Sequence, residues 1–239
     1  MNATLTTISW QGLFLAFVPV AVVIGIMFRW SAGAPTAIYG TARMLIQLLL
    51  IGYVLLFILE SEQPAVIIAI LVVMLSVASW IAIRPLKKKQ PRIYLNSLIA
   101  ISVAGILTLA LVSQVIIGVQ PWFSPRYVVP LAGMIFAGSM NAVSLAAERL
   151  QSEYDRGTPY VEARRIALIA ALIPITNSFF AVGLVSLPGM MTGQILSGVS
   201  PLVATKYQIV VMTMLFGTSG ISAALYLVLA ERSLKYSNA

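Results

Sequence analysis

Seven long apolar runs dominate the 239-residue chain, and each is long enough to cross a bilayer as a helix. A helix needs about 20 apolar residues to span the hydrocarbon core. Lipid offers the backbone no hydrogen-bond partner, so only helices or a closed barrel can occupy that core, and runs of this length favour helices. The sequence therefore predicts an all-α polytopic membrane protein in which residues 1–239 form a single transmembrane domain. The predicted spans are approximately 10–29, 36–59, 64–84, 94–117, 127–147, 166–186 and 207–230.

The composition supports this fold class and excludes several functions. Only 9% of the residues are charged, whereas a soluble domain carries about 25%. Cysteine and histidine are both absent, which removes disulfides, thiolate metal sites and the usual general base. The pair Gly-Lys never occurs, so the chain has no nucleotide-binding P-loop. We therefore expect neither an enzyme nor a cofactor bound by this chain.

The basic residues predict the orientation of the spans. The net charge is +8, and in a soluble protein such an excess suggests nucleic acid. Here the positive-inside rule explains it, so no nucleic-acid partner is expected. With the N-terminus outside and the C-terminus cytoplasmic, twelve basic residues fall inside and two, Arg126 and Lys206, fall outside. The chain is thus predicted to be a multi-pass protein of the inner (plasma) membrane, in contact with the bilayer along all seven spans.

The connection between the sixth and seventh spans is uncharged but cannot form a continuous helix. Three glycines and two prolines interrupt the run from Ser186 to Pro201. Irregular backbone at membrane depth is tolerated where protein or a water-filled cavity satisfies it, and broken helices often line a transport path. We therefore predict a broken segment over about 186–206 that contributes to a path or gate. The alternative is a tight turn with a short amphipathic helix at the membrane surface. The candidate path residues here are Pro188, Gly189, Met190, Met191, Thr192 and Gln194.

Four polar residues within the spans are further candidates for the path. Arg43 and Gln47 share one helix face because they are four residues apart. Asn141 lies in the fifth span, and Asn177 follows the proline at 174, which should kink the sixth span. An arginine inside the membrane is a functional candidate, although snorkelling or a structural ion pair would explain Arg43 equally well. No carboxylate lies in the middle of any span, which argues against a proton relay.

A polar connection between the fifth and sixth spans, about 148–165, is the only region dense in charges of both signs. Its pattern predicts helix, turn, helix. Gly157 is a plausible helix stop, and Thr158 is predicted to cap a second helix, with Glu162 near the capping-box position. A short charged helical element suits docking to a soluble partner. An ordinary solvated loop, anchored to lipid by its arginines, is the alternative.

Two stretches resemble a known family. The runs Ala42–Tyr53 and Val185–Pro201, followed by Tyr207-Gln208, are similar to the FetB (YbbM) type of ABC transporter permease, which the plant aluminium-tolerance permeases also resemble. The resemblance implies a permease subunit that works as a homodimer with a separate cytoplasmic ABC ATP-binding subunit, where ATP is bound. The activity it implies is export of iron.

The resemblance also implies a coupling helix within 148–165, on the cytoplasmic face. The residues it assigns to coupling with the ATP-binding subunit are Glu148, Glu153, Asp155, Gly157, Thr158, Glu162 and Arg164.

The residue types available make iron a difficult cargo. Without cysteine, histidine or a buried carboxylate, a tight and fully dehydrated iron site is not expected, and the thioethers of Met190 and Met191 are only weak metal ligands. A metal chelate or an organic solute would remove this difficulty. Two alternatives of other classes stay open: a stand-alone secondary carrier or channel, and a membrane scaffold without transport.

Overall fold

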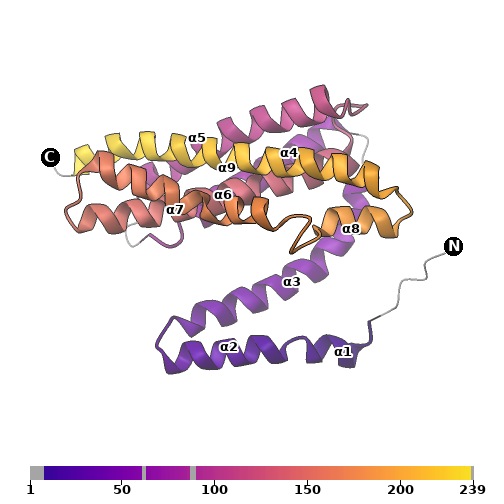
Figure 1. The fold of residues 1–239 in the computed structure, drawn as a ribbon, viewed down its shortest axis with the longest axis horizontal. Helices are drawn as coiled ribbons and strands as arrows, with labels where there is room; N and C mark the ends of the chain where they lie inside the picture. The colour runs from indigo at the N-terminus through magenta and orange to yellow at the C-terminus, as the bar shows by residue number, and fades with distance from the viewer. Residues whose placement is uncertain (1–7, 61–62, 87–89, 238–239) are drawn as a thin grey trace. The chain divides into compact units, whose positions relative to one another are not determined.

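The computed structural model describes residues 8–60, 63–86 and 90–237, which are almost entirely helical (Figure 1). The chain divides into two compact units, Met1–Glu60 and Ser61–Ala239. Within the described residues, seven helical stretches are long and apolar enough to cross a membrane. This confirms the predicted all-α fold with seven spans. That the two units act as one transmembrane domain stays a prediction.

The first unit contains α1 (Trp10–Leu15), α2 (Val18–Arg29) and α3 (Ala34–Leu59). The first predicted span, 10–29, is therefore interrupted, because α1 ends at Leu15 and α2 begins at Val18, although Ala16 and Phe17 between them keep right-handed helical backbone angles. The turn between α2 and α3 uses left-handed backbone at Ser31 and Gly33, with φ of 54° and 75°. This turn reverses the chain and lets α2 pack on α3.

The second unit is a helical bundle in which α6 and α9 form the most extensive pair and α5 and α7 each pack against both of them (Figure 1). A proline occupies the first or second position of α4, α5 and α6, where its missing N–H costs nothing and its fixed φ favours the helix. A π-helical turn, η1, continues α5. The elements are α4 (Pro64–Ala82), α5 (Pro91–Ala110), η1 (Leu111–Ile116), α6 (Pro125–Asp155), α7 (Tyr160–Ala181), α8 (Gly189–Leu196) and α9 (Pro201–Ser237).

Small residues form the faces on which these helices meet. Ala100 and Ala104 of α5 and Ala142 and Ala146 of α6 are buried. A β-carbon added at Gly105 would lie 2.8 Å from a ring carbon of Phe136, so α5 approaches α6 too closely for any larger residue. Such close approach drives helix association in membranes, where lipid is as apolar as leucine.

Two helices of this bundle are longer than the predicted spans. α6 begins at Pro125, contains Pro130 and continues to Asp155. α9 begins at Pro201, so the last residues of the predicted broken segment, 201–206, are regular helix. Hydropathy marks only the apolar part of a helix, and here polar turns extend the helices beyond it.

Candidate functional site

The turn between α6 and α7 is organised around the carboxylate of Glu153. This residue is only 7% exposed, and its Oε1 forms an ion pair of 2.7 Å with Arg149, one turn earlier on α6. A second arginine, Arg156, lies 3.7 Å from the same oxygen. The hydroxyl of Thr158 donates to Oε2 at 3.2 Å. Because a buried charge is tolerated only when paired and hydrogen-bonded, these contacts fix the turn to the end of α6.

The predicted pattern of helix, turn and helix is present. Its two helical pieces are the end of α6, which runs unbroken to Asp155, and the start of α7 at Tyr160, so no separate helix lies between them. Gly157 does end the first helix, as predicted, with a left-handed φ of 84°. The predicted cap was wrong, because the hydroxyl of Thr158 bonds Glu153 and Pro159 holds the N-cap position without a side-chain bond.

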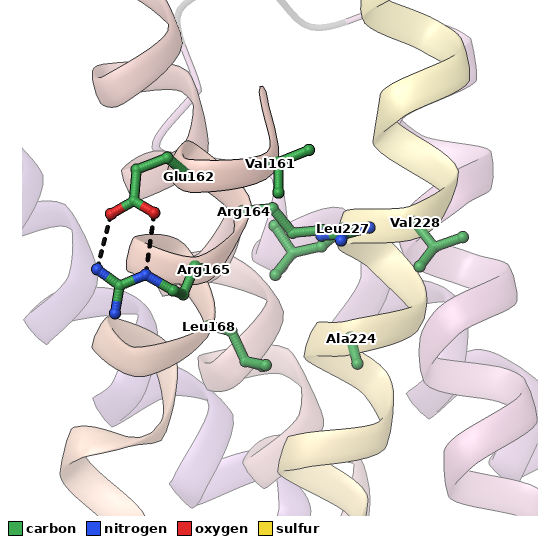
Figure 2. Close-up of a pocket in the computed structure, with 8 residues that line it drawn as sticks. All are labelled: Val161, Glu162, Arg164, Arg165, Leu168, Ala224, Leu227 and Val228. Atoms are coloured by element: carbon green, nitrogen blue, oxygen red, sulfur yellow. Dashed lines mark hydrogen bonds and ion pairs between the residues drawn. The ribbon is translucent and has the colours of Figure 1, made fainter. Parts of the chain in front are cut away.

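Glu162 does not close a capping box either. Its carboxylate accepts two hydrogen bonds from Arg165, at 3.0 and 2.7 Å, and Figure 2 shows this bidentate pair on the first turns of α7. The hydroxyl of Tyr160 donates to the carbonyl of Leu227 on α9. The start of α7 is thereby tied to α9.

A pocket of about 440 Å³ opens between α7 and α9 beside this turn (Figure 2). Arg164, a predicted coupling residue, lines it together with the Glu162–Arg165 pair. The α9 side is apolar. Glu148 and Asp155 are exposed on α6 and do not line the pocket. The coupling candidates thus gather at one end of the bundle, on α6, the turn and α7. The lining residues are Val161, Glu162, Arg164, Arg165, Leu168, Ala224, Leu227 and Val228.

The predicted break between the last two spans is present at the other end of the bundle. α7 ends at Ala181, and a short turn closed by a bridge between Val182 and Ser186 leads to α8. Gly198, with φ of 92°, then turns the chain into α9. α8 packs on α9, so α7 and α8 form two pieces of a discontinuous helix beside one continuous helix (Figure 1).

A cavity of about 480 Å³ lies between α6, α8 and α9. Two predicted path residues, Met190 and Gln194, line it from α8. The side-chain amide oxygen of Gln194, Oε1, is buried and has no hydrogen-bond partner among the described residues. Pro188, Gly189, Met191 and Thr192 belong to the same short helix and its cap but do not line this cavity. The other lining residues are Ile117, Arg126, Tyr127, Pro130, Leu131, Met134, Val199, Val203, Tyr207, Val210 and Val211.

A second, smaller cavity of about 170 Å³ lies farther along the same helices, between α6, α7 and α9. Asn141, another predicted path residue, lines it with Pro174, Ser178 and Ser219. Asn177 is exposed and does not line it. The residue next to Asn177, Ser178, does contact the proline, because its hydroxyl donates a hydrogen bond to the carbonyl of Pro174 at 3.0 Å.

The remaining predictions concern Arg43, Gln47 and the methionines. Arg43 and Gln47 lie on α3 in the first unit, and their role in a path stays a prediction. Only Met190 of the two predicted methionines lines the large cavity. Across residues 8–60, 63–86 and 90–237, no group of three or more histidine, cysteine or acidic residues is placed to hold a metal ion.

Sequence reasoning missed three residues of the large cavity. From the sequence alone, Arg126 is only a basic residue on the outer side of the membrane, and Tyr127 and Tyr207 have no predicted role. They come from the first turn of α6 and the second turn of α9, which are about 80 positions apart in the chain. Only the parallel packing of α6 on α9, with both helices starting at the same end of the bundle, brings them together.

Among the described residues, seven candidate spans, five of them in a helical bundle with a broken segment beside two cavities, are typical of a polytopic membrane permease. The chain belongs to the family described as "Uncharacterised protein family (UPF0014)", whose family model matches residues 10–165 and 158–234.

Three relatives support this assignment. The chain is 31% identical to the UPF0014 membrane protein slr1647 of Synechocystis, over 93% of this chain and 85% of that one. It is 33% identical to the "Probable iron export permease protein FetB" of Escherichia coli, over 93% and 90% of the two chains. The protein ALUMINUM SENSITIVE 3 of Arabidopsis thaliana is 33% identical, over 78% and 72%. No solved structure matches the chain.

Proposed function

We propose that the chain is the permease subunit of an ABC-type exporter of iron, driven by a separate ATP-binding subunit. The similarity to the FetB permease over 93% of the chain supports the transport function and the cargo. The absence of any Gly-Lys pair from the sequence supports a division of labour in which ATP is bound elsewhere. In this proposal the permease is a homodimer of the inner membrane, with its N-terminus outside and its C-terminus cytoplasmic.

The observation that carries the proposal is the rigid, charged turn between α6 and α7. A soluble motor can move membrane helices only if its contact surface is firmly joined to them. The Glu153 cluster joins the turn to α6, and the bond from Tyr160 to Leu227 joins α7 to α9. The exposed Glu162–Arg165 pair and Arg164 stand beside it and supply the charges for docking.

The transport cycle follows from this arrangement. Closure of the ATP-binding subunits would displace the turn, and α6 and α7 would move with it. Both helices line the smaller cavity, and α6 also lines the larger one, so access to both would change. The broken segment over α8 would then act as the outer gate. ATP shifts such an equilibrium only because the partner contacts the two states with different affinity.

The test is co-purification of the tagged chain with candidate ABC ATP-binding subunits of the same organism, followed by ATPase assays in proteoliposomes. We expect a stable complex whose ATPase activity rises with ferrous iron or an iron chelate. Glu162→Lys should weaken the complex at least tenfold, because it reverses a charge on the docking surface. Glu60→Lys, a charge reversal in the first unit, is the matched control and should leave the complex intact.

Each other outcome has a defined meaning. If no ATP-binding subunit associates with the chain, the ABC proposal fails and a stand-alone carrier becomes the leading function. A complex that forms equally well with Glu162→Lys would place the docking surface elsewhere. Stimulation by an organic solute alone would keep the permease and remove iron as its cargo.

A further inference from the structure

The large cavity between α6, α8 and α9 has an unusual balance of charge for a metal exporter. Thirteen residues line it, and Arg126 is the only charged one. None of the ion pairs among the described residues includes Arg126. A bare divalent cation in this cavity would meet a positive charge and no carboxylate, although hard cations prefer oxygen ligands of negative charge.

Two helix ends add to the positive potential of the cavity. Arg126 and Tyr127 belong to the first turn of α6, and Val203 to the first turn of α9. The N-terminus of a helix carries a partial positive charge and favours anions. Together with the guanidinium of Arg126, these two helix ends place three sources of positive potential around the cavity, whose volume is about 480 Å³.

The other polar groups in the lining suit an oxygen-rich ligand. Tyr127 and Tyr207 carry phenol hydroxyls, which both donate and accept hydrogen bonds. Gln194 contributes an amide whose buried carbonyl oxygen has no partner among the described residues. Such a group costs free energy until a ligand or water satisfies it.

The remaining lining is apolar and favours an organic body over a hydrated ion. Valine, leucine, isoleucine, proline and methionine supply nine of the thirteen residues. Cavities of about 300–1,000 Å³ with mostly apolar walls and a few polar groups are typical of small-molecule sites. The water molecules around a hydrated metal ion would find no hydrogen-bond partners on these apolar walls.

We propose that this cavity binds a small organic anion, with Arg126 as the charge that selects it, and that iron enters only as an anionic chelate. This inference rests on the proposed transport function in one respect only, namely that the bound anion is the transported cargo. Binding itself requires no ATP-binding subunit. Figure 1 shows α6 and α9 running side by side along the bundle, and the smaller cavity lies farther along the same two helices.

The first test measures binding to the purified full-length chain in lipid nanodiscs, by isothermal titration with three probes: ferrous iron alone, citrate alone and ferric citrate. We expect citrate, free or iron-loaded, to bind, and ferrous iron alone not to bind. Arg126→Gln should weaken binding at least tenfold, and Arg126→Lys should retain most of it. Arg84→Gln, which removes an arginine outside the cavity, is the matched control. Binding of ferrous iron that is independent of Arg126 would overturn the proposal.

A second test needs no knowledge of the ligand. The chain contains no cysteine, so Met190→Cys places a single thiol in the cavity lining. Its reaction rate is measured with two methanethiosulfonate reagents of similar size, one carrying a sulfonate and one a trimethylammonium group. The quantity compared is the ratio of the anionic reagent's rate to the cationic reagent's rate. We expect this ratio to be higher at the thiol in the cavity than at a free thiol in solution. Adding Arg126→Gln should lower that ratio at least threefold, whereas adding Arg84→Gln should not.

The two tests also separate this inference from the proposed function. A rate ratio that does not change with Arg126→Gln, or that favours the cation, refutes the anion site even if an ATP-binding subunit associates. A ratio that responds to Arg126, in a chain that associates with no ATP-binding subunit, would keep the anion site and refute the ABC proposal.

Discussion

The two units of this protein are both strongly apolar but bury very different shares of their residues. The two spans of the first unit have mean hydropathies of 2.3, and 0% and 6% of their most apolar windows are buried. The spans α6 and α9 of the second unit are less apolar, at 1.6 and 1.7, yet 44% and 39% are buried. Hydropathy therefore identifies which segments enter the membrane and says nothing about which of them form the core.

The difference lies in the small residues. The buried faces of α5, α6 and α9 are rich in alanine, glycine, serine and threonine, while the exposed faces of α2 and α3 carry valine, isoleucine, leucine and aromatic residues. In lipid, large apolar side chains gain nothing by leaving the bilayer, and close packing of small ones supplies the attraction between helices. The first unit is thus suited to contact with lipid or with another chain.

The largest expected effect comes from filling the closest helix contact of the second unit. Gly105→Leu should destabilise the protein by about 3 kcal/mol, because overpacking a tight core costs about 1–3 kcal/mol and sometimes more and the new side chain would collide with Phe136. Gly52→Leu on α3 is the control, since nothing lies within 4 Å of a β-carbon at that position. Thermal unfolding in detergent measures both. Equal losses would contradict the comparison.

A smaller loss is expected where the second unit buries a charge. Glu153→Gln should cost about 1.5–3 kcal/mol, the range for hydrogen bonds to charged groups, because it removes the negative partner of Arg149 and Arg156. Glu162→Gln removes an exposed pair with Arg165 and should change the stability little, since surface ion pairs contribute little. Unfolding midpoints of the two variants in the same detergent decide the matter. A larger loss for the Glu162 variant would contradict the assignment of Glu153 as the anchor.

Two buried hydroxyls offer a finer test within the core. Ser97 donates to the carbonyl of Ser79 at 3.2 Å, and Ser97→Ala should cost about 0.6 kcal/mol, the average for such bonds between membrane helices. Ser139 is fully buried, but its hydroxyl has no partner among the described residues. Ser139→Ala should leave the stability unchanged or raise it slightly. Chemical unfolding curves have the precision to distinguish the two variants, and the reverse order would refute the assignment.

The smallest effect is expected from removing the first unit. A chain that starts at residue 61 loses two spans, so the orientation of the remaining five is preserved. Because the core lies in the second unit, its unfolding midpoint should shift by less than about 2 °C, the change that about 0.5 kcal/mol produces in a domain of this size. Differential scanning fluorimetry of the truncated chain tests this. Failure to fold would show that the first unit is required for the bundle.

The elements with a local signal in the sequence were predicted well. The seven spans follow from run length, the break before α9 from its prolines and glycines, and the stop at Gly157 from the need for left-handed backbone. The ion pair between Arg149 and Glu153, at 2.7 Å, has the i,i+4 spacing at which side chains on one helix face meet. Each of these signals lies within a few residues of the structure it determines.

What depends on packing between distant segments was not predictable. A proline usually marks the start of a helix, but Pro130 lies inside α6. Thr158 stands where the sequence pattern predicts a helix cap, but its hydroxyl donates a hydrogen bond to the nearby carboxylate of Glu153 instead. The meeting of Arg126, Gln194 and Tyr207 around one cavity requires α6 and α9 to pack side by side in parallel, and a single sequence carries no signal for that packing.

The unbroken course of α6 from Pro125 to Asp155 connects the two ends of the bundle mechanically. At 1.5 Å per residue, its 31 residues extend over about 46 Å. A tilt of about 5° around the midpoint of such a rod displaces each end by about 2 Å, in opposite directions. A hydrogen bond is lost over a displacement of this size, so a small rocking motion at Glu153 would change the reach of Arg126 toward an anion bound as proposed.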